Sequence, residues 1–165
     1  MKSIQAIPAK IITLQSLMKQ ATRWRLQNKK IVFTNGVFDI LHQGHIASLS
    51  EAATYGDVLV VAVNADDSVK KLKGPGRPVN NEQARTLMLA SLLMTDAVIL
   101  FNEDTPLNLI TALLPDVLVK GGDYTIEQIA GAKEVLAAGG TVKIAQIVEG
   151  ISTTAIIEKM KTLEG

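Results

Sequence analysis

The stretch Phe33–Ala52, FTNGVFDILHQGHIASLSEA, joins a short apolar run to an alanine- and leucine-rich segment through an Asn-Gly pair. The run 30–35 is β-branched and aromatic and stops at a turn signal, so it is predicted to be a strand. The segment 45–55 is followed by Gly56 and is predicted to be a helix. This strand–turn–helix unit is the pattern from which the rest of the fold follows.

Four more apolar runs follow the first one, and segments of helical character separate them. The runs show little in–out alternation, as expected of strands buried on both faces of a parallel sheet. The sequence therefore predicts an α/β fold, a doubly wound, Rossmann-like, five-stranded parallel sheet with helices on both faces. The predicted strands are 30–35, 57–64, 96–101, 116–121 and 141–148, and the predicted helices are 14–27, 45–55, 81–94, 125–138, 153–163 and one that starts at Thr105-Pro106.

The composition is that of one globular domain. The chain has 165 residues, of which 47% are hydrophobic and 20% charged, and its formal net charge is +1. We expect one domain over 1–165, with 1–29 as a helical lead-in and 30–163 as the core. The balanced charge gives no reason to expect a nucleic-acid or membrane partner. No signal peptide and no apolar run of about 18 residues is visible, so a cytoplasmic location is expected.

The cysteine count excludes several chemistries. The chain has no cysteine. It therefore has no disulfide framework, no cysteine-ligated zinc site and no thiol nucleophile.

Four segments that follow predicted strands are expected to meet at one edge of the sheet, because ligands of open α/β folds bind beyond the carboxyl ends of the strands. They are 35–45, the basic segment 64–80, 120–124 and 149–154. Segment 64–80 is predicted to be one long irregular loop, with Asp66-Asp67 as a solvated turn at its start.

His42 and His45 leave three interpretations open. They could hold a metal together with Asp39, they could be structural, or they could bind an anion. A helix N-terminus presents unpaired N–H groups and about half a positive charge, and Gly44 would let a phosphate come close. Ser152, Thr153 and Thr154 mark a second predicted helix start with more hydroxyls than capping requires. Two such starts at one sheet edge would suit a triphosphate.

Two motifs carry a resemblance to a known family. TNGVFDILHQGHIASL (34–49) and GISTT (150–154) resemble the two signatures of the HxGH nucleotidyltransferase superfamily. The stretches 68–92, 103–124 and 129–142 resemble the adenylyltransferase domain of the enzyme that makes ADP-heptose for bacterial lipopolysaccharide. The resemblance covers about Lys10 to Lys159, without the sugar-kinase domain that often precedes this domain, so a stand-alone form is expected.

This resemblance implies a reaction and its partners. D-glycero-β-D-manno-heptose 1-phosphate would attack the α-phosphorus of ATP and yield ADP-heptose and pyrophosphate. Mg²⁺ would accompany the ATP, and relatives of this kind are often homodimers, so a homodimer is expected.

The resemblance also implies roles for individual residues. The histidines would bind the ATP phosphates and stabilise the transition state, and Lys73 would join them as a catalytic residue. Lys73 and Arg77 would bind the sugar phosphate, and Asp39 would either help to hold the metal, cap the turn or orient His42. The residues expected to bind the nucleotide are Asn35, Gly36, Phe38, His42, Gly44, His45, Arg85, Lys120, Gly121, Gly122, Asp123, Ser152, Thr153 and Thr154.

Other functions stay open at this point. The chain could be a cytidylyl- or adenylyltransferase for another phosphorylated alcohol, such as glycerol 3-phosphate. It could also be a nucleotide-binding module without catalysis, although such a module would have little need for both histidines. A dinucleotide-dependent oxidoreductase is disfavoured, because GPGRPV (74–79) is no GxGxxG motif and lies in the wrong place.

Overall fold

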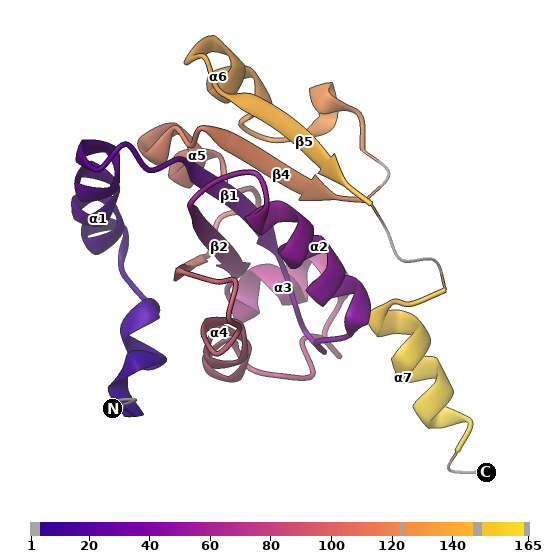
Figure 1. The fold of residues 1–165 in the computed structure, drawn as a ribbon. Coiled ribbons are helices and arrows are strands. Elements are labelled where there is room, and N and C mark those ends of the chain that lie inside the picture. The colour runs from indigo at the N-terminus through magenta and orange to yellow at the C-terminus, as the bar shows by residue number, and fades with distance from the viewer. Residues whose placement is uncertain (1–3, 123, 147–149, 164–165) are drawn as a thin grey trace.

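The predicted α/β architecture is confirmed by a computed structural model, which describes residues 4–122, 124–146 and 150–163. All strand pairs are parallel, and the strand order is β3-β2-β1-β4-β5 (Figure 1). Four strands match their predicted ranges to within one residue at each end, while the last one ends earlier than predicted. The strands are β1 (Ile31–Gly36), β2 (Val58–Asn64), β3 (Ala97–Phe101), β4 (Val117–Gly121) and β5 (Thr141–Ala145).

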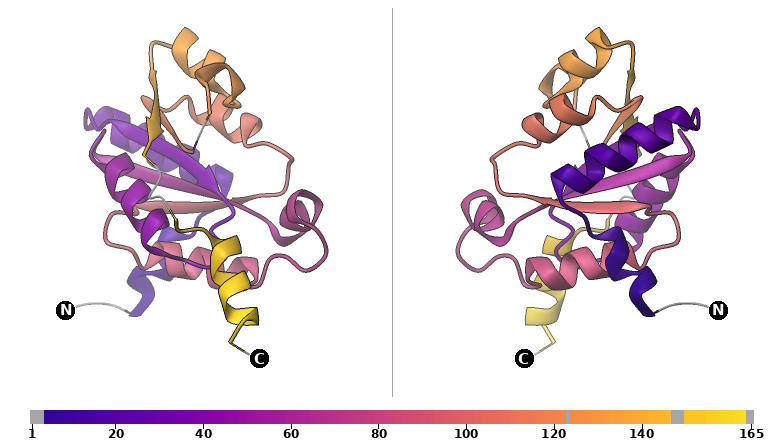
Figure 2. Two further views of the ribbon diagram at one scale, coloured as in Figure 1. Left: turned by 90° about the vertical axis from the view of Figure 1, so that its right-hand side faces the viewer. Right: turned by 90° about the vertical axis from the view of Figure 1, so that its left-hand side faces the viewer.

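Helices connect the strands and cover both faces of the sheet. Helices α1, α5 and α6 bury their apolar side chains on one face, and α2 and α4 cover the other. The two views in Figure 2 show helices on both sides of the strands. The α-helices are α1 (Leu14–Leu26), α2 (Gln43–Ala53), α3 (Asp66–Lys73), α4 (Glu82–Ala90), α5 (Leu107–Leu113), α6 (Ala132–Ala137) and α7 (Thr153–Lys161), and short 3₁₀ helices cover Ile4–Ala6, Pro8–Lys10 and Ile126–Gln128.

The prediction of an irregular segment over 64–80 was wrong, because its first half is helix α3. Asp66 and Asp67 lie in the first turn of this helix instead of a solvated turn, and three lysines lie in its last turn. Acidic residues at the start of a helix and basic residues at its end both stabilise the helix by interacting favourably with its dipole. Ser68 and Val69 are fully buried, so tertiary packing holds a segment whose high charge had suggested a loop.

The predicted helix 125–138 is also interrupted. A 3₁₀ turn over Ile126–Gln128 is followed by a separate α6, and Gly131 between them has a positive φ of 83°. A left-handed residue cannot continue an α-helix, so the two pieces stay separate.

The amino-terminal lead-in takes part in the core. Leu17 and Ala21 of α1 are completely buried against the sheet. Before α1, Ile11 forms a bridge with Val98, and the Ile12 N–H donates to the Val98 carbonyl at 2.9 Å. This contact covers the outer side of β3 with a short piece of chain, which protects an edge strand from pairing with other molecules.

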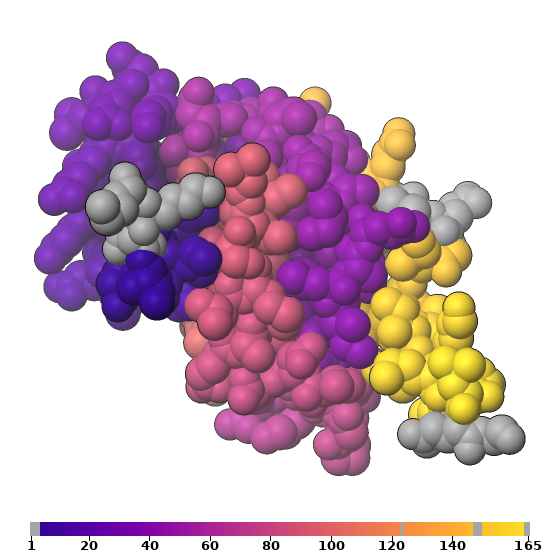
Figure 3. All heavy atoms as spheres, turned by 60° about the horizontal axis from the view of Figure 1, so that its bottom comes forward, coloured from indigo at the N-terminus to yellow at the C-terminus, as the bar shows by residue number. Residues whose placement is uncertain are grey.

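Helix α7 stands apart from this packing. None of its residues is buried, and Figure 3 shows it projecting at the side of the molecule next to α2. In the part of the chain that the structure describes, no helix has the length and apolar character needed to cross a membrane.

Three aspartates fix the amino-terminal ends of the strands. Asp57 accepts the Lys30 N–H at 2.8 Å, Asp96 accepts the Leu59 N–H at 2.8 Å, and Asp116 accepts the Ile31 N–H at 2.7 Å. Each aspartate directly precedes one strand and binds the beginning of the neighbouring one. The register is therefore set at the amino-terminal edge of the sheet. The loops at the carboxyl-terminal edge do not have this role and are free to form a site.

We expect the substitution Asp116→Ala to lower the free energy of unfolding by about 1–2 kcal/mol, because the Ile31 N–H loses a charged acceptor. Urea unfolding would measure the change. Asp104→Ala, at an exposed position, is the matched control and should stay within about 0.5 kcal/mol of the wild type. Equal losses in both variants would contradict a role for Asp116 in the register.

Candidate active site

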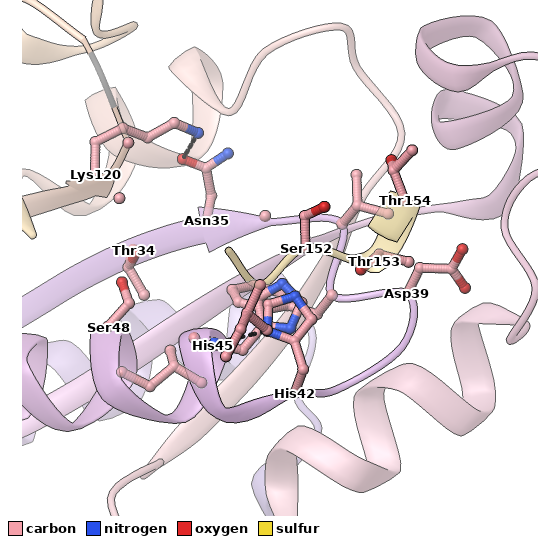
Figure 4. Close-up of a pocket in the computed structure, with 18 of the residues that line it drawn as sticks. Thr34, Asn35, Asp39, His42, His45, Ser48, Lys120, Ser152, Thr153 and Thr154 are labelled. Atoms are coloured by element: carbon pink, nitrogen blue, oxygen red, sulfur yellow. Dashed lines mark hydrogen bonds between the residues drawn. The ribbon is translucent and has the colours of Figure 1, made fainter. Parts of the chain in front are cut away.

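A pocket of about 400 Å³ lies beyond the carboxyl ends of β1 and β4 (Figure 4). The four predicted segments meet there, since residues after β1, after α3, after β4 and before α7 all line it. This is the point at which the strand order changes direction, as expected for a doubly wound sheet. The predicted residues that line the pocket are Asn35, Gly36, Phe38, Asp39, His42, Gly44, His45, Lys73, Arg77, Lys120, Gly121, Gly122, Ser152, Thr153 and Thr154.

His42 is the N-cap of helix α2. Its Nδ1 accepts the backbone N–H of His45 at 3.4 Å, so in the neutral ring the proton lies on Nε2. Gly44 makes this cap possible, because a Cβ there would lie 3.1 Å from both Nδ1 and Cε1 of His42. His42 therefore keeps an N–H donor in addition to the N–H groups of the helix start.

The two histidine rings stack on each other. Their centroids are 3.8 Å apart at an interplanar angle of 18°, and the Phe38 ring meets His45 edge-on at 5.3 Å. Burial, and to a smaller extent the charge of the stacked His42, lower the pKa of His45 to about 4, although the Ile40 carbonyl acts in the opposite direction. Nδ1 of His45 is buried and forms no hydrogen bond of ordinary geometry within the described residues. Burial thus keeps His45 as a neutral ring.

The second helix start lies across the pocket from the first. The Ser152 hydroxyl accepts the Ala155 N–H at 3.1 Å and caps α7, as the sequence predicts for one of the three hydroxyls. The Thr153 hydroxyl donates to the Ile40 carbonyl at 3.5 Å, which joins the two helix starts. Thr154 lines the same pocket. The geometry permits these hydroxyls to bind a phosphate, which stays a prediction.

Lys120 and Asn35 occupy the opposite end of the pocket, where β4 and β1 stop. The Lys120 ammonium donates to the Asn35 Oδ1 at 3.4 Å and lies 5.5 Å from the centre of the Tyr124 ring. Burial lowers the pKa of Lys120. Asp123, predicted to bind the nucleotide, lies outside the described residues.

Sequence reasoning missed Ser48 and Tyr124, which both line the pocket. Ser48 follows His45 by three positions on α2, so helical spacing could have indicated that it faces the same side. No comparable signal marks Tyr124 beyond its place after the glycine pair.

The predicted contact between Arg85 and the ATP phosphates was wrong. Arg85 is completely buried and does not line the pocket, because it lies on the inner face of α4. Its guanidinium donates to the carbonyls of Asn80 and Val37 at 3.0 and 2.7 Å and to the Asp66 carboxylate at 2.7 Å. Arg85 is thus a structural residue beneath the site.

The metal interpretation of Asp39 finds no support in its surroundings. Its carboxylate accepts hydrogen bonds from Arg77, Val79 and Asn80, and it is 1% exposed. Burial alone would raise the pKa of Asp39, but the N–H groups of Asn80 and Val79 and the Arg77 guanidinium outweigh it and lower the pKa. Across residues 4–122, 124–146 and 150–163, no three His, Cys, Asp or Glu side chains are placed to share a metal ion. The capping role is therefore the one that the structure supports.

Residues 33–159 match the family described as cytidylyltransferase-like. The chain belongs to this family. Among curated relatives, the bifunctional protein HldE of Koribacter versatilis is 52% identical over 158 residues, which are 96% of this chain and 32% of that protein. HldE of Shewanella sediminis is 58% identical over 136 residues, or 82% of this chain and 29% of that protein. This cytidylyltransferase-like chain thus spans about a third of the length of the curated relatives it matches.

Two solved structures resemble this chain. The lipopolysaccharide core biosynthesis protein from Thermoplasma volcanium is 33% identical, with a TM-score of 0.58 over 73% of this chain and 97% of that one. Pantoate-beta-alanine ligase from Francisella tularensis has the same TM-score at 15% identity, over 94% of this chain and 78% of that one, and supports the fold alone.

The lowered pKa of His45 predicts a pH effect on stability. Below its ordinary value of about 6.5, the unfolded chain binds a proton at this position that the folded chain does not bind until about pH 4. The free energy of unfolding should therefore fall as the pH is lowered from about 6.5 towards 4, and this part of the decrease should be absent above that window. Urea unfolding between these pH values would show a weaker decrease for His45→Gln. The same pH dependence in both proteins would contradict a neutral, buried His45.

Proposed function

We propose that this chain is a nucleotidyltransferase that joins ATP and D-glycero-β-D-manno-heptose 1-phosphate to give ADP-heptose and pyrophosphate. Family membership supports the nucleotidyl transfer. The long matches to HldE, together with the resemblance of 68–92, 103–124 and 129–142 to the ADP-heptose enzyme, support the substrates. A product of this kind would supply heptose for lipopolysaccharide.

One observation carries the proposal: two helix N-termini face a single pocket. Helix α2 presents its free N–H groups with His42 and His45, and α7 presents its own with Ser152 and Thr154. Each start carries about half a positive charge and binds anions well. The arrangement suits a triphosphate that lies between the two helices.

The reaction needs no protein nucleophile. An oxygen of the sugar phosphate, already ionised at neutral pH, attacks the α-phosphorus of ATP, and the bond from this phosphorus to the bridging oxygen of pyrophosphate breaks. Negative charge on the oxygens around the α-phosphorus rises in the transition state, where the Nε2–H of His42 and the α2 amides can donate. Catalysis then consists of positioning and charge stabilisation.

The two ends of the pocket suit the two substrates. Lys120 and Asn35 lie at one end of the view in Figure 4, and Asp39 and Thr154 lie at the other. At the end with Lys120, the backbone of the glycine pair and the Tyr124 ring line the pocket and could contact a base and ribose. Arg77 is bound to Asp39 at the other end, and with Lys73, which also lines the pocket, it would bind the sugar phosphate.

The residues that the structure describes do not form a protein cage for Mg²⁺, since Asp39 is already occupied by N–H donors. Mg²⁺ often keeps several waters and relies on substrate phosphates. We therefore treat it as part of the substrate, MgATP, and assign no protein ligand to it. The homodimer stays a prediction, which light scattering would test.

The first test is pyrophosphate release with Mg²⁺, in which ATP and CTP are each combined with heptose 1-phosphate and with glycerol 3-phosphate. Release with ATP and heptose 1-phosphate alone would support the proposal. Release with CTP and glycerol 3-phosphate alone would keep the reaction type and overturn the substrates. No release from folded protein in any combination would contradict the proposed function.

His45→Ala should lower kcat by roughly 10²–10³-fold with a smaller change in the KM for ATP, because the ring supports the donors that act in the transition state. Steady-state kinetics would show this. Ser50→Ala, at an exposed position of the same helix, is the matched control and should retain wild-type kinetics. A raised KM with unchanged kcat would contradict this role of His45.

A further inference from the structure

A buried carboxylate links the basic loop between α3 and α4 (residues 74–81) to the histidine loop between β1 and α2 (residues 37–42). Asp39 accepts the Arg77 Nε–H at 2.6 Å and the N–H groups of Val79 and Asn80 at 2.8 and 2.9 Å. In return, the Asn80 side chain donates to the Asp39 carbonyl at 2.6 Å. We call this set of contacts between Asp39 and residues 77, 79 and 80 the Asp39 latch.

Arg85 closes the latch from beneath. It binds the carbonyls of Asn80 in the basic loop and Val37 in the histidine loop, and it is completely buried. Both loops are thus held to one guanidinium as well as to one carboxylate. A shift of Asn80 relative to Asp39 would break several charge-assisted hydrogen bonds at once, which are the strong ones in proteins.

The rest of the basic loop has few contacts of its own. A Cβ built on Gly74 or Gly76 would meet nothing within 4 Å, so the space beside these residues is open. Glycine also gives the backbone its largest conformational freedom. The latch is therefore the main set of contacts that fixes the position of Arg77, since no side chain in the described part of the chain packs beside the two glycines before it.

The latch leaves one side of the Arg77 guanidinium available. Only Nε is used by Asp39, and the two terminal nitrogens have no hydrogen-bond partner among the described residues. Arg77 lines the pocket, while the Asp39 carboxylate points away from the two histidines in Figure 4. A guanidinium held in this way presents a fixed pair of donors, which matches the oxygens of a phosphate.

We propose that Asp39 is a positioning residue that holds Arg77 for the sugar phosphate. This inference rests on the proposed function for the identity of the ligand. By holding the arginine before the ligand arrives, the latch lowers the entropy lost on binding.

The sign of the change in the KM for the sugar phosphate distinguishes positioning by Asp39 from a simple electrostatic effect. Asp39 carries a negative charge close to the place where a phosphate would bind. If charge alone mattered, Asp39→Asn would favour phosphate and lower the KM for the sugar phosphate. If positioning matters, the same substitution places an amide donor against the donors of the loop, Arg77 becomes mobile, and the KM rises.

The test compares Asp39→Asn, Arg77→Ala and the double variant in steady-state kinetics. We expect each single variant to raise the KM for the sugar phosphate about tenfold and the KM for ATP less than about twofold. The double variant should resemble Arg77→Ala, because Asp39 acts through Arg77. A lower KM in Asp39→Asn, equal effects on both substrates, or multiplied effects in the double variant would overturn the inference. Lys71→Met, at an exposed position of α3, is the control and should be silent.

A second variant covers the case in which Asp39→Asn does not fold. Arg77→Lys leaves Asp39 and the backbone contacts in place and keeps the charge, but it removes the planar fork. A rise in the KM for the sugar phosphate of about tenfold would support a positioned guanidinium, and an unchanged KM would overturn it.

Hydrogen exchange tests the latch without depending on the proposed activity. The amides of Val79 and Asn80 should exchange slowly in the wild type and in Arg77→Ala, and rapidly in Asp39→Asn. If no substrate pair turns over, the proposed function fails, and slow exchange that is lost in Asp39→Asn still supports the latch. Unchanged exchange in that variant overturns the latch, whatever the activity.

Discussion

The hydrogen bond from the His45 amide to Nδ1 of His42 is the interaction on which the site depends. It starts helix α2, fixes which nitrogen of His42 carries the proton and brings the ring back over Gly44. A Cβ at position 44 would lie 3.1 Å from the ring, so a larger residue there would require the ring to shift by a few tenths of an ångström. Once His42 is in this position, His45 stacks beneath it, and burial keeps the second ring neutral. One cap therefore sets the tautomer of His42 and the position against which the His45 ring stacks.

The sheet decides where this cap lies. Strand β1 runs through the middle of the strand order, with β2 on one side and β4 on the other. The chain leaves β1 and β4 in opposite directions across the sheet, which opens a crevice above them. The start of α7 reaches this crevice from more than a hundred residues further along the chain, and Thr153 joins it to Ile40. The aspartates at the other edge of the sheet fix the starts of β1 and β2 and so the position of the strand that leads into α2.

Much of this was predictable from local sequence. The strands are continuous apolar runs, and the two helix starts carry short motifs whose residues act on their nearest neighbours. What failed was the part that depends on which face of an element is buried. Helix α3 reads as a charged loop because only Ser68 and Val69 are buried in it. Arg85 and Asp39 carry the right charges for a phosphate and a metal. In the folded protein, however, Arg85 is buried beneath the site, and the Asp39 carboxylate accepts hydrogen bonds from backbone N–H groups.

The exposure of helix α7 affects the affinity of the nucleotide site that we propose. Helix α7 buries none of its residues, so the folded chain gains little free energy by keeping the helix in place. A triphosphate between the two helix starts would add contacts that the protein itself lacks there. Part of its binding free energy would then be used to hold α7 in place, which would weaken the overall affinity. In the proposed reaction, the same weak packing would make it easier for α7 to move away when pyrophosphate leaves.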